Sequence, residues 1–398
     1  MAGQSPANCS LLLKSKFDSI AYMKKSNSYT TNNMKIKEVI NFLEQKFPLH
    51  WQEDFDNCGI QCGDKERTIT GIVVCFDMSE AVIDEAIAKG ANMVISHHPI
   101  IYKNGLKKIE PINRVGKILC KALENKILLY SMHTNIDSGK EGGNVLFAQK
   151  LGLKKLSVLS PKENQFCKLV VFVPSENSLM LKEALFRTGC GNIGNYSHCS
   201  YSCEGIGSFK PLAGANPHIG KHNRMERVEE ERIEIIFPTN KKRQVIDTLY
   251  QNHPYEEPAF DIIALENQDR EVGLGRVGWL PKPVPANDFV HYIKEKLSLE
   301  FVKFSGNLDA EIKKVAVCGG GGASFVADAL AAGADAFITG DLKYHDFFIP
   351  ENKMLLMDIG HFEGEHFIRE IIVSLLKENF DIFATHFTEV EFPVIYRA

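Results

Sequence analysis

The sequence has no long hydrophobic run and no block of basic residues. A membrane-spanning helix needs about 18 or more consecutive apolar residues, so no segment of the 398 residues is predicted to cross a membrane. The short Leu11–Leu13 patch followed by Lys14 does not resemble a secretory signal, and the protein is predicted to be cytoplasmic. A formal net charge of -4 without basic clusters argues against nucleic acid as a partner.

Closely paired cysteines are also missing. None of the 10 cysteines forms a Cys-x-x-Cys pair, so neither a disulfide framework nor a zinc ribbon is predicted. Cys58 with Cys62 and Cys199 with Cys203 have a spacing that could suit a metal, but each pair lacks a second pair. Three further cysteines lie in apolar runs, where a free thiol behaves as a small hydrophobe: Cys75, Cys120 and Cys318.

Apolar residues are plentiful, at 44% of the chain, and the length suggests two or three domains with a core each. Residues 1–33 are rich in Ser, Asn, Lys and Thr without sustained periodicity. They are predicted to be a poorly ordered N-terminal extension, and Met34 could be an alternative start.

The most chemically specific stretch is Asn92-Met-Val-Ile-Ser-His-His-Pro-Ile100. An alanine-rich helical segment precedes this apolar run, which predicts a buried parallel strand that ends at two histidines. Pro99 restricts His98 to an extended backbone, so the side chains of His97 and His98 point to opposite sides. The pair could therefore bind two neighbouring ions, or it could consist of hydrogen-bonded loop residues.

Two neighbouring predicted strands end in polar clusters. A strand at 72–76 is followed by a helix from Ser79, its predicted N-cap, to Lys89, and then by the strand that ends at His97. A second helix at 112–125 leads to a strand at 127–132, which ends in His133-Thr-Asn-Ile-Asp137. Because ligands collect at the carboxyl ends of parallel strands, both clusters are expected at the same sheet edge.

The chain contains an internal repeat, in which an offset of 243 residues aligns Ile72–His98 with Val315–Asp341. Two residues of the first strand match Val317 and Cys318, and five residues of the helix and second strand match Ala329, Ala331, Gly333, Ala334 and Ile338. A later strand at 354–357 repeats the strand before His133, and it ends in Asp358-Ile-Gly-His-Phe-Glu-Gly-Glu-His366. The repeat predicts two halves of one topology.

The pattern changes between the halves. Two strand-helix-strand units separated by a glycine-rich loop region predict a ferredoxin-like (α+β) insert. The four histidines of this segment, His198, His218, His222 and His253, have no metal-like spacing and are expected at surface or loop positions. The fold class is therefore α/β, with two similar lobes that form one metal-binding domain. The predicted boundaries are 34–160 for the first lobe, 161–266 for the insert and 267–398 for the second lobe.

Five side chains would meet if the sheet-edge argument holds: His97, His98, Asp137, His361 and Glu365. Mixed imidazole and carboxylate ligands suit zinc, iron or manganese. Five ligands are more than one catalytic zinc uses, which favours two divalent ions per subunit that share a carboxylate. His361 and Glu365 are four residues apart and would project from one face of a helical turn, so Glu365 could bridge. An exposed helix start, where Glu is favoured, is the alternative.

Two other features could carry chemistry. His133 and His345 are the candidate proton-transfer residues, although each could equally be a plain loop residue. Four consecutive glycines, Gly319–Gly322, lie between a predicted strand and helix. They predict a tight turn, or backbone amides that receive an anionic group. The run is not a P-loop, because no Gly-Lys-Ser/Thr follows it.

These motifs closely resemble those of the Nif-three-like family of dinuclear metal centre proteins, often labelled GTP cyclohydrolase type 2 homologues. The residues that carry the resemblance are Ser96–Pro99, His133–Asp137, Cys318–Gly322, Thr339–Asp341 and Gly360–Glu365, with the loop Asp56–Gly59 beside them. The resemblance covers Met34 to the C-terminus. It implies a homohexamer of two-lobed subunits with metal ligands at the five residues named above.

The insert resembles that of the long bacterial members of the family, which is similar to the PII/CutA-like fold. Two motifs carry this part of the resemblance: Gly205-Ile-Gly-Ser-Phe-Lys-Pro211 and His253-Pro-Tyr-Glu-Glu-Pro258.

The sequence leads to two functional hypotheses. The first is a metal-dependent hydrolase that acts on a nucleotide-like or phosphorylated small molecule. The second is a non-enzymatic metal-binding or regulatory hexamer whose insert senses a ligand. The family label alone is a weak guide to the substrate, because one fold hosts many reactions.

Overall fold

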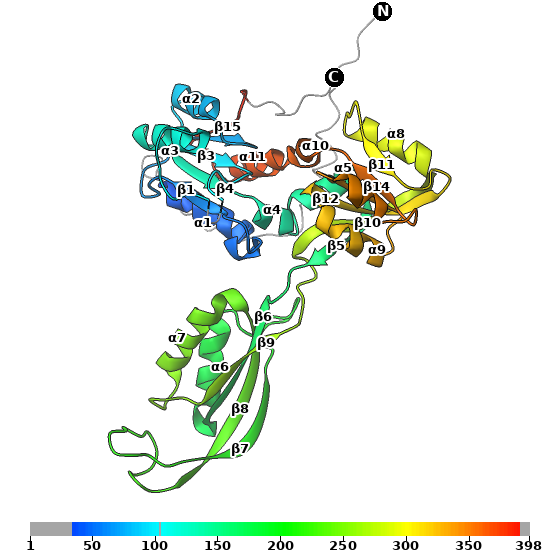
Figure 1. Ribbon diagram of the computed structural model, residues 1–398. Coiled ribbons are helices and arrows are strands. Elements are labelled where there is room, and N and C mark those ends of the chain that lie inside the picture. The colour runs from blue at the N-terminus through cyan, green and yellow to red at the C-terminus, as the bar shows by residue number, and fades with distance from the viewer. Residues whose placement is uncertain (1–33, 103–104, 391–398) are drawn as a thin grey trace, which may run out of the picture.

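The computed structural model describes residues 34–102 and 105–390, so the predicted N-terminal extension at 1–33 lies outside the described residues. Two sheets with their helices form the body of the molecule, and a third sheet with two helices extends away from it (Figure 1). Among the described residues, no helix is both long enough and apolar enough to span a membrane.

The first sheet has the order β1-β4-β3-β2-β15. Strands β2, β3, β4 and β15 are parallel, and β1 pairs antiparallel with β4. Every residue of β2, β3 and β4 is buried, as expected for a parallel sheet with helices on both faces. The bounds are β1 (Gly59–Cys62), β2 (Gly71–Cys75), β3 (Met93–Ser96), β4 (Leu128–Ser131) and β15 (Ala384–Phe387).

Helices cover both faces of this sheet. On one face, α2 (Glu80–Ala88) and α3 (Arg114–Glu124) pack against alternate strand residues, and on the other face α1 (Ile36–Lys46) and α11 (Ile368–Asn379) do the same. Ser79 caps α2 as predicted, because its Oγ accepts a hydrogen bond of 3.2 Å from the backbone N–H of Val82. Asn113 caps α3 in the same way through Gly116.

The second sheet has the order β11-β14-β13-β12-β10-β5, with β12, β13 and β14 parallel. Helices α5 (Gly143–Lys150) and α8 (Ala286–Lys296) cover one face, and α9 (Val326–Ala331) covers the other. The strand bounds are β5 (Lys154–Pro161), β10 (Gly273–Pro285), β11 (Lys303–Ser305), β12 (Glu311–Gly321), β13 (Ala336–Gly340) and β14 (Leu355–Asp358).

The aligned segments of the internal repeat pair with the same register in both sheets. In the first sheet Ile72 lies opposite Met93, and in the second sheet Val315 lies opposite Ala336. All four positions obey the offset of 243 found in the sequence. The two strand-helix-strand units therefore share a backbone arrangement as well as a residue pattern.

Each sheet also receives a strand from the other half of the chain. Strand β5 follows the first sheet in sequence but pairs with β10 of the second sheet. Strand β15 follows the second sheet in sequence but pairs with β2 of the first sheet, and α11 packs against the first sheet through Ile368, Ile372 and Val373. These two exchanges tie the sheets together.

The third sheet comprises β6 (Phe166–Pro174), β7 (Tyr201–Phe209), β8 (Glu226–Pro238) and β9 (Phe260–Leu265). Its order is β7-β8-β6-β9 with every neighbouring pair antiparallel. Helices α6 (Ser178–Arg187) and α7 (Lys242–Asn252) share a core with one face of this sheet. Figure 1 shows the two helices together on that face. We call residues 161–266 the insert.

Two details of the insert differ from the sequence prediction. The region expected to be only a glycine-rich loop contains β7, and the strand after it, β8, is 13 residues long. Most of the residues of β7 are exposed, so no apolar alternation marks this strand, and its pairing with β8 defines it instead. His253 lies in the loop after α7, as one of the two predicted alternatives had it, and it is buried there.

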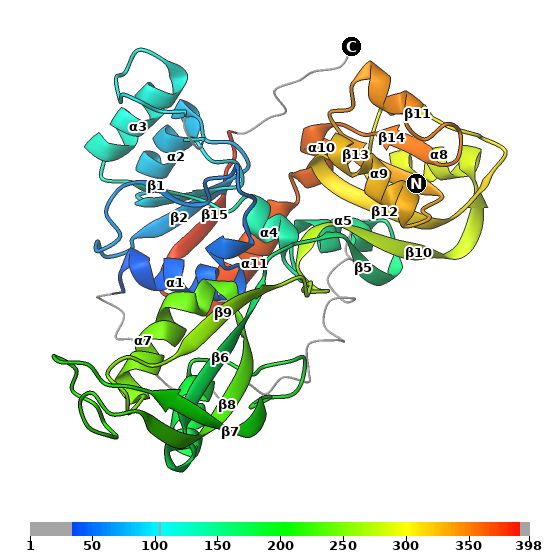
Figure 2. The same ribbon diagram turned by 60° about the horizontal axis from the view of Figure 1, so that its bottom comes forward.

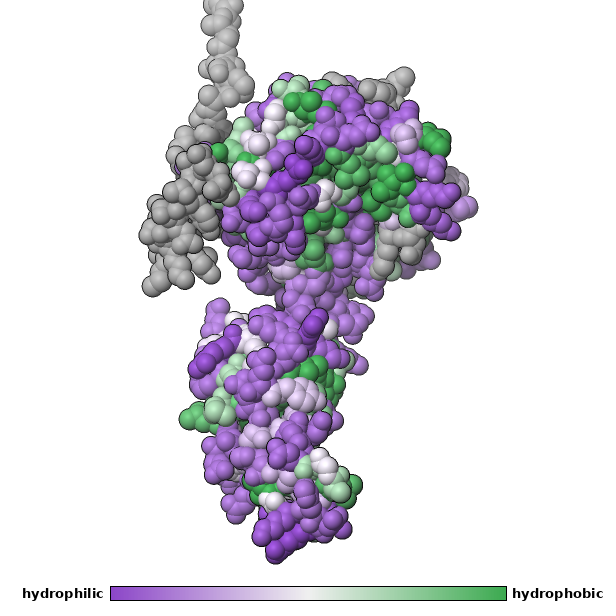
Figure 3. Space-filling view, turned by 90° about the vertical axis from the view of Figure 1, so that its left-hand side faces the viewer, coloured by the Kyte–Doolittle hydropathy of each residue, from purple (hydrophilic) through white to green (hydrophobic). Residues whose placement is uncertain are grey.

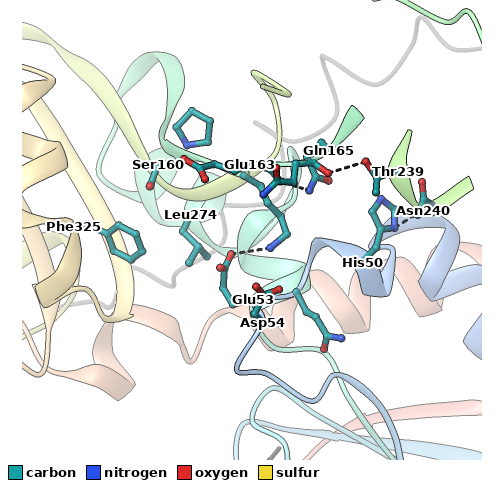
Figure 4. A pocket seen from close by; sticks show the side chains of 14 residues that line it. His50, Glu53, Asp54, Ser160, Glu163, Gln165, Thr239, Asn240, Leu274 and Phe325 are labelled. Atoms are coloured by element: carbon teal, nitrogen blue, oxygen red, sulfur yellow. Dashed lines mark hydrogen bonds and ion pairs between the residues drawn. The ribbon is translucent and has the colours of Figure 1, made fainter. Parts of the chain in front are cut away.

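A narrow, mostly hydrophilic waist joins the insert to the body (Figure 3). A polar pocket of about 600 Å³ lies at this junction (Figure 4). Lys162 of the insert forms an ion pair of 3.3 Å with Glu53 of the body, and Asn240 contacts His50 at 3.3 Å. Part-exposed ion pairs contribute little to stability, so these two contacts add little to the free energy that holds the insert against the body.

Candidate metal centre

The two histidines of the sequence motif directly follow strand β3. His97 is fully buried, whereas His98 is partly exposed. The hydroxyl of Ser96 lies 2.9 Å from that of Ser131 at the end of β4, and it donates to the carbonyl of His98. This network holds the ends of β3 and β4 together beneath the two imidazoles.

Asp137 lies on a short helix, α4 (Thr134–Ser138), which begins immediately after β4 and His133. The parallel pairing of β3 with β4 brings this helix to the same sheet edge as the two histidines, as the sequence predicted. The side chain of Asp137 is buried, and its Oδ2 lies 3.7 Å from Nε2 of His97.

His361 and Glu365 come from the other sheet, on the helix α10 (His361–Glu365) that follows β14. Gly360 precedes this helix with a φ of 93°, a conformation that favours glycine. The two side chains meet as their spacing predicted, with 3.1 Å between His361 Nε2 and Glu365 Oε2. Figures 1 and 2 both show α4 and α10 between the two sheets.

Glu365 is the centre of the cluster. Its Oε2 lies 3.5 Å from Nε2 of His97 and 3.6 Å from Nε2 of His98, in addition to its contact with His361. Three groups of side chains place their ligand atoms within 4.8 Å of one another: His97 with Asp137 and Glu365, His98 with His361 and Glu365, and His97 with His98 and His133. These groups could hold a metal ion.

Two of the imidazoles are anchored through Nδ1 within the first sheet. His97 Nδ1 donates to the backbone carbonyl of Met132 at 2.8 Å. His98 Nδ1 lies 2.9 Å from Oδ1 of Asp77, the residue that follows the end of β2 by two positions. Each of these bonds leaves Nε2 free to face Glu365. The two side chains therefore converge on one carboxylate, and the prediction that they point to opposite sides is wrong.

The other two imidazoles are anchored in the same way by carboxylates. His361 Nδ1 lies 2.7 Å from Oδ2 of Asp341, and His133 Nδ1 lies 2.8 Å from Oδ1 of Asp56. Ligating histidines in metal sites almost always carry such a partner on the second ring nitrogen, which fixes the tautomer and raises the basicity of the other nitrogen. All four histidines therefore share this feature of metal-binding histidines.

The cluster also contains polar atoms that lack satisfactory partners. Nε2 of His97 and Oε2 of Glu365 are buried without a hydrogen bond of acceptable geometry. Nε2 of His98 faces Nε2 of His361 at 3.2 Å, so two atoms of the same kind point at each other. Buried polar groups are nearly always paired, and a cation between these atoms would satisfy them together. The donor set thus fits a metal.

Burial and neighbouring charges shift the pKa values of the two buried carboxyl groups, Asp137 and Glu365, in opposite directions. Burial, followed by the nearby charge of Glu365, raises the pKa of Asp137 well above its ordinary value. Burial also acts to raise the pKa of Glu365, but contacts with His361, His97 and His98 outweigh it and hold that pKa well below the ordinary value. A negative charge is therefore concentrated on Glu365 among the imidazoles.

The pKa values of the histidines also shift in opposite directions. Burial lowers the pKa of His97 to about 4. Burial acts in the same direction on His98 and His361, but the carboxylates outweigh it. Asp77 and Glu365 raise the pKa of His98 to about 10, and Glu365 and Asp341 raise that of His361 to about 9. The carboxylates therefore favour the protonated forms of these two imidazoles.

The four-glycine run packs against Glu365. A Cβ on Gly320 would lie 2.2 Å from Oε1 of Glu365, and a Cβ on Gly319 would lie 2.8 Å from its Cγ. Asn144 accepts a hydrogen bond of 2.8 Å from the N–H of Gly319. The tight turn predicted for this run is wrong, because Gly319–Gly321 form the end of β12, whose pairing with β13 is irregular between Val317 and Gly321. The absent side chains leave room for the carboxylate of Glu365.

The loop at Asp56 supports the site from the side. Besides His133, the carboxylate of Asp56 accepts hydrogen bonds from the N–H groups of Thr134 and Asn57 and from the hydroxyl of Thr134. The thiol of Cys58 donates to it at 3.2 Å, so this cysteine is a hydrogen-bonding residue of the loop. These contacts hold the pKa of Asp56 well below its ordinary value, although burial opposes them.

Sequence reasoning did not assign roles to the three anchoring aspartates. Asp56 belongs to one of the motifs that carry the family resemblance, and Asp341 occupies the position that corresponds to His98 in the repeat. Asp77 carries no signal of its own, because only the folded structure brings it to His98. Asp341 adopts a φ of 57°, which aspartate tolerates better than most residues.

The structure separates the two candidate proton-transfer residues. His133 lies beside the cluster, within reach of His97 and His98. His345 is exposed on the turn η5 (Tyr344–Phe348), where its ring contacts those of Tyr344 and Phe348. No group of metal-competent side chains in the described part of the chain includes His345. A role for His345 stays a prediction.

Known proteins resemble this chain over most of its length. A family model described as Duf34/NIF3 (NGG1p interacting factor 3) matches residues 34–393. The GTP cyclohydrolase 1 type 2 homolog of Bacillus subtilis is 40% identical over 345 residues, which cover 85% of this chain and 91% of that protein. The protein of the same name from Halalkalibacterium halodurans is 39% identical over 328 residues, or 81% of this chain and 87% of that protein.

Solved structures resemble the fold as well. The Bacillus cereus protein related to NIF3 has a TM-score of 0.74 and 34% identity, and the match covers 92% of this chain and 100% of that one. A Staphylococcus aureus protein has a TM-score of 0.73 and 29% identity, with 92% and 99% covered. The resemblance first noted in the motifs is confirmed, and the chain belongs to the Duf34/NIF3 family.

Proposed function

We propose that this protein binds two divalent metal ions per chain between its two sheets. His97, Asp137 and Glu365 would hold one ion, His98, His361 and Glu365 would hold the other, and the carboxylate of Glu365 would be shared. One observation carries the proposal: three histidines with anchored Nδ1 atoms, His97, His98 and His361, place their Nε2 atoms within 3.6 Å of Oε2 of the buried Glu365. The mixture of nitrogen and oxygen donors favours zinc, iron or manganese.

We further propose that the site is that of a hydrolase for a nucleotide-like or phosphorylated small molecule. When bound, two such ions would polarise the substrate and lower the pKa of a water molecule. Relatives named GTP cyclohydrolase 1 type 2 homolog make guanine nucleotides the first compounds to try. His133 would move protons, because its Nδ1 is held by Asp56 while its ring lies 5.1 Å from that of His97.

The metal proposal is tested by elemental analysis of untagged protein that has been purified without chelators and then reconstituted. About two ions per chain are expected in the native protein. The variants His97→Ala and Glu365→Ala are expected to lose most of this metal, whereas Glu378→Gln, an exposed change on α11, should keep it. Far less than two ions per reconstituted native chain would refute the dinuclear assignment.

The hydrolase proposal needs a separate test, since a metal site can exist without turnover. Reconstituted protein is screened against nucleotides and phosphorylated metabolites. Activity that disappears in both His97→Ala and Glu365→Ala would support the assignment. Metal-loaded native protein that turns over none of these compounds would refute it and leave the metal proposal intact.

The alternative function is a non-enzymatic metal-binding or regulatory assembly with a ligand-sensing insert. The attachment of the insert through a narrow polar waist favours it, because such a junction could transmit a change of orientation.

We propose that the insert is a ferredoxin-like, PII/CutA-like domain, which its sheet order β9-β6-β8-β7 supports. We propose a homohexamer on the family resemblance, and sedimentation of the full chain as a monomer would contradict it.

A further inference from the structure

The two insert motifs converge on one cavity. Residues Ser208–Pro211, from the end of the first motif, and Tyr255–Glu257, from the second, line a pocket of about 250 Å³ beside the loop that joins β7 to β8. Figure 1 shows that this end of the insert is remote from α4 and α10. Cavities for drug-sized ligands typically begin near 300 Å³, so this pocket suits a small molecule.

A buried carboxylate forms part of the pocket wall. The side chain of Glu230, on β8, belongs to a residue that is only 8% exposed. Its Oε1 accepts a hydrogen bond of 2.8 Å from the hydroxyl of Tyr255. No donor among the described residues reaches its Oε2. This oxygen lies where a Cβ on Gly207 would approach to 2.0 Å, so glycine makes room for it.

The position of Tyr255 is held by His253. The backbone N–H of Tyr255 donates to Nδ1 of His253 at 3.1 Å, and Nε2 of His253 donates to the carbonyl of Phe172 at 2.9 Å. Both ring nitrogens are used, so His253 is neutral and structural. Its role explains why a buried histidine begins the second motif.

Aromatic rings and prolines form the remaining walls. The ring centroid of Phe209 lies 5.6 Å from that of Tyr255, and the ring of His218 lies 6.4 Å from it on another side. Pro211 and Pro217 complete the lining. The faces of aromatic rings attract cations, and they do so most strongly where the cation is partly removed from water.

The charge of the lining is mainly negative. Glu230, Glu256 and Glu257 contribute three carboxylates, whereas Lys210 is the one lysine of the lining. Within the described part of the chain, none of these four residues takes part in an ion pair, and Glu256 accepts a hydrogen bond from the N–H of Asn216. The pocket therefore presents unneutralised negative charge beside aromatic faces.

We propose that this pocket binds a small organic cation, a primary ammonium or guanidinium compound. Its N–H groups would donate to the open oxygen of Glu230, and its carbon chain would lie against Phe209 and Tyr255. A metal ion is disfavoured, because no three metal-ligating side chains of the described residues cluster here. The proposal is independent of the proposed metal centre.

The experiment is isothermal titration of the full chain with agmatine, which carries both a guanidinium and an ammonium group. Saturable binding is expected. Glu230→Gln keeps the shape and the Tyr255 contact but removes the charge, and it should weaken binding at least about tenfold, as expected for a charge-assisted hydrogen bond. Tyr255→Phe should weaken it a few-fold.

The matched control is Glu229→Gln, which removes a carboxylate from the adjacent, exposed position of β8 and should leave affinity unchanged. Succinate, an anion of similar length, should not bind. The proposal is overturned if millimolar agmatine shows no saturation, if Glu230→Gln and Glu229→Gln bind it equally, or if succinate binds as well as agmatine.

Discussion

The two strand-helix-strand units of the repeat have one backbone arrangement and opposite tasks. The first, β2-α2-β3, ends in His97 and His98, which present imidazoles to the site. The second, β12-α9-β13, ends in Gly340 and Asp341 at the corresponding positions. Only the first unit contributes imidazoles. The second leaves room for Glu365 and provides a hydrogen-bond partner for His361, the two proposed ligands on α10.

The difference between the two units can be followed at the corresponding positions of the repeat. Asp77 anchors His98 in the first unit, and its counterpart in the second unit is Gly320, which has no side chain and so leaves room for Glu365. The counterpart of His98 is Asp341, which anchors His361. The same scaffold thus holds a proposed metal ligand, His98, in one unit and the hydrogen-bond partner of another proposed ligand, His361, in the other.

The largest effect is expected from filling the space in the second unit. Gly320→Ala would place a Cβ 2.2 Å from Oε1 of Glu365 and force that carboxylate to move. We expect metal affinity to fall by more than about 100-fold, beyond the usual effect of removing an outer partner. Metal content after dialysis against a graded chelator buffer measures it.

The control for this change is Gly333→Ala. Gly333 has a φ of 67°, close to the 62° of Gly320, but a Cβ there would meet nothing within 4 Å. Both variants carry the same backbone strain, and only one disturbs Glu365. Equal metal affinity in the two variants would show that the glycine run does not protect the site.

The anchoring aspartates should have equal effects in the two units. Asp77→Ala and Asp341→Ala each remove the Nδ1 partner of one histidine, and each should weaken metal binding by about 10- to 100-fold. Asp84→Ala, which removes an exposed ion pair with Lys121, is the control and should bind metal normally. A loss of metal affinity in only one of the two aspartate variants would contradict the expectation that the two anchors have equal effects.

The pH dependence of metal binding should follow His98 and His361. Their pKa values are raised, to about 10 and about 9, so protons compete with a metal for these two rings at neutral pH. Metal affinity should therefore fall as the pH falls, by about tenfold per pH unit for each proton released. Calorimetry in buffers of different ionisation enthalpy counts these protons, and a pH-independent affinity between pH 6 and 8 would contradict the expectation.

The smallest effect concerns the helix ends of the two units. Gly90 and Gly333 correspond in the repeat, have φ values of 66° and 67°, and have open space around them. Replacing either by alanine should lower the free energy of unfolding by about 1 kcal/mol through backbone strain alone. Urea unfolding compares them, and clearly unequal losses would mean that packing, not the shared backbone, governs these positions.

Much of the candidate site could be predicted because its residues directly follow apolar strands. His97 and Asp137 follow β3 and β4, whose parallel pairing places them at one edge of the first sheet, and His361 follows β14 of the second sheet. The spacing of His361 and Glu365 predicts a shared helix face, and their 3.1 Å contact agrees with it. These inferences need only local periodicity and the rules of parallel sheets.

Other features could not be predicted in this way. Strand β7 exposes most of its residues and exists because β8 pairs with it, so no local pattern marks it. The exchange of β5 and β15 between the sheets depends on which edges are available in three dimensions. Asp77 became a histidine partner only when β2 and β3 were placed side by side.

The sequence by itself determined the repeat, the family and the ligand-type residues, since these follow from residue identity and spacing. Only the tertiary structure decided how these residues meet. It brought His98 and His361 to 3.2 Å across the two sheets, oriented four Nδ1 atoms toward their anchors, and left Nε2 of His97 buried without a partner. The physical reason is that burial and distance set the charge state of each group, and both are properties of the folded chain.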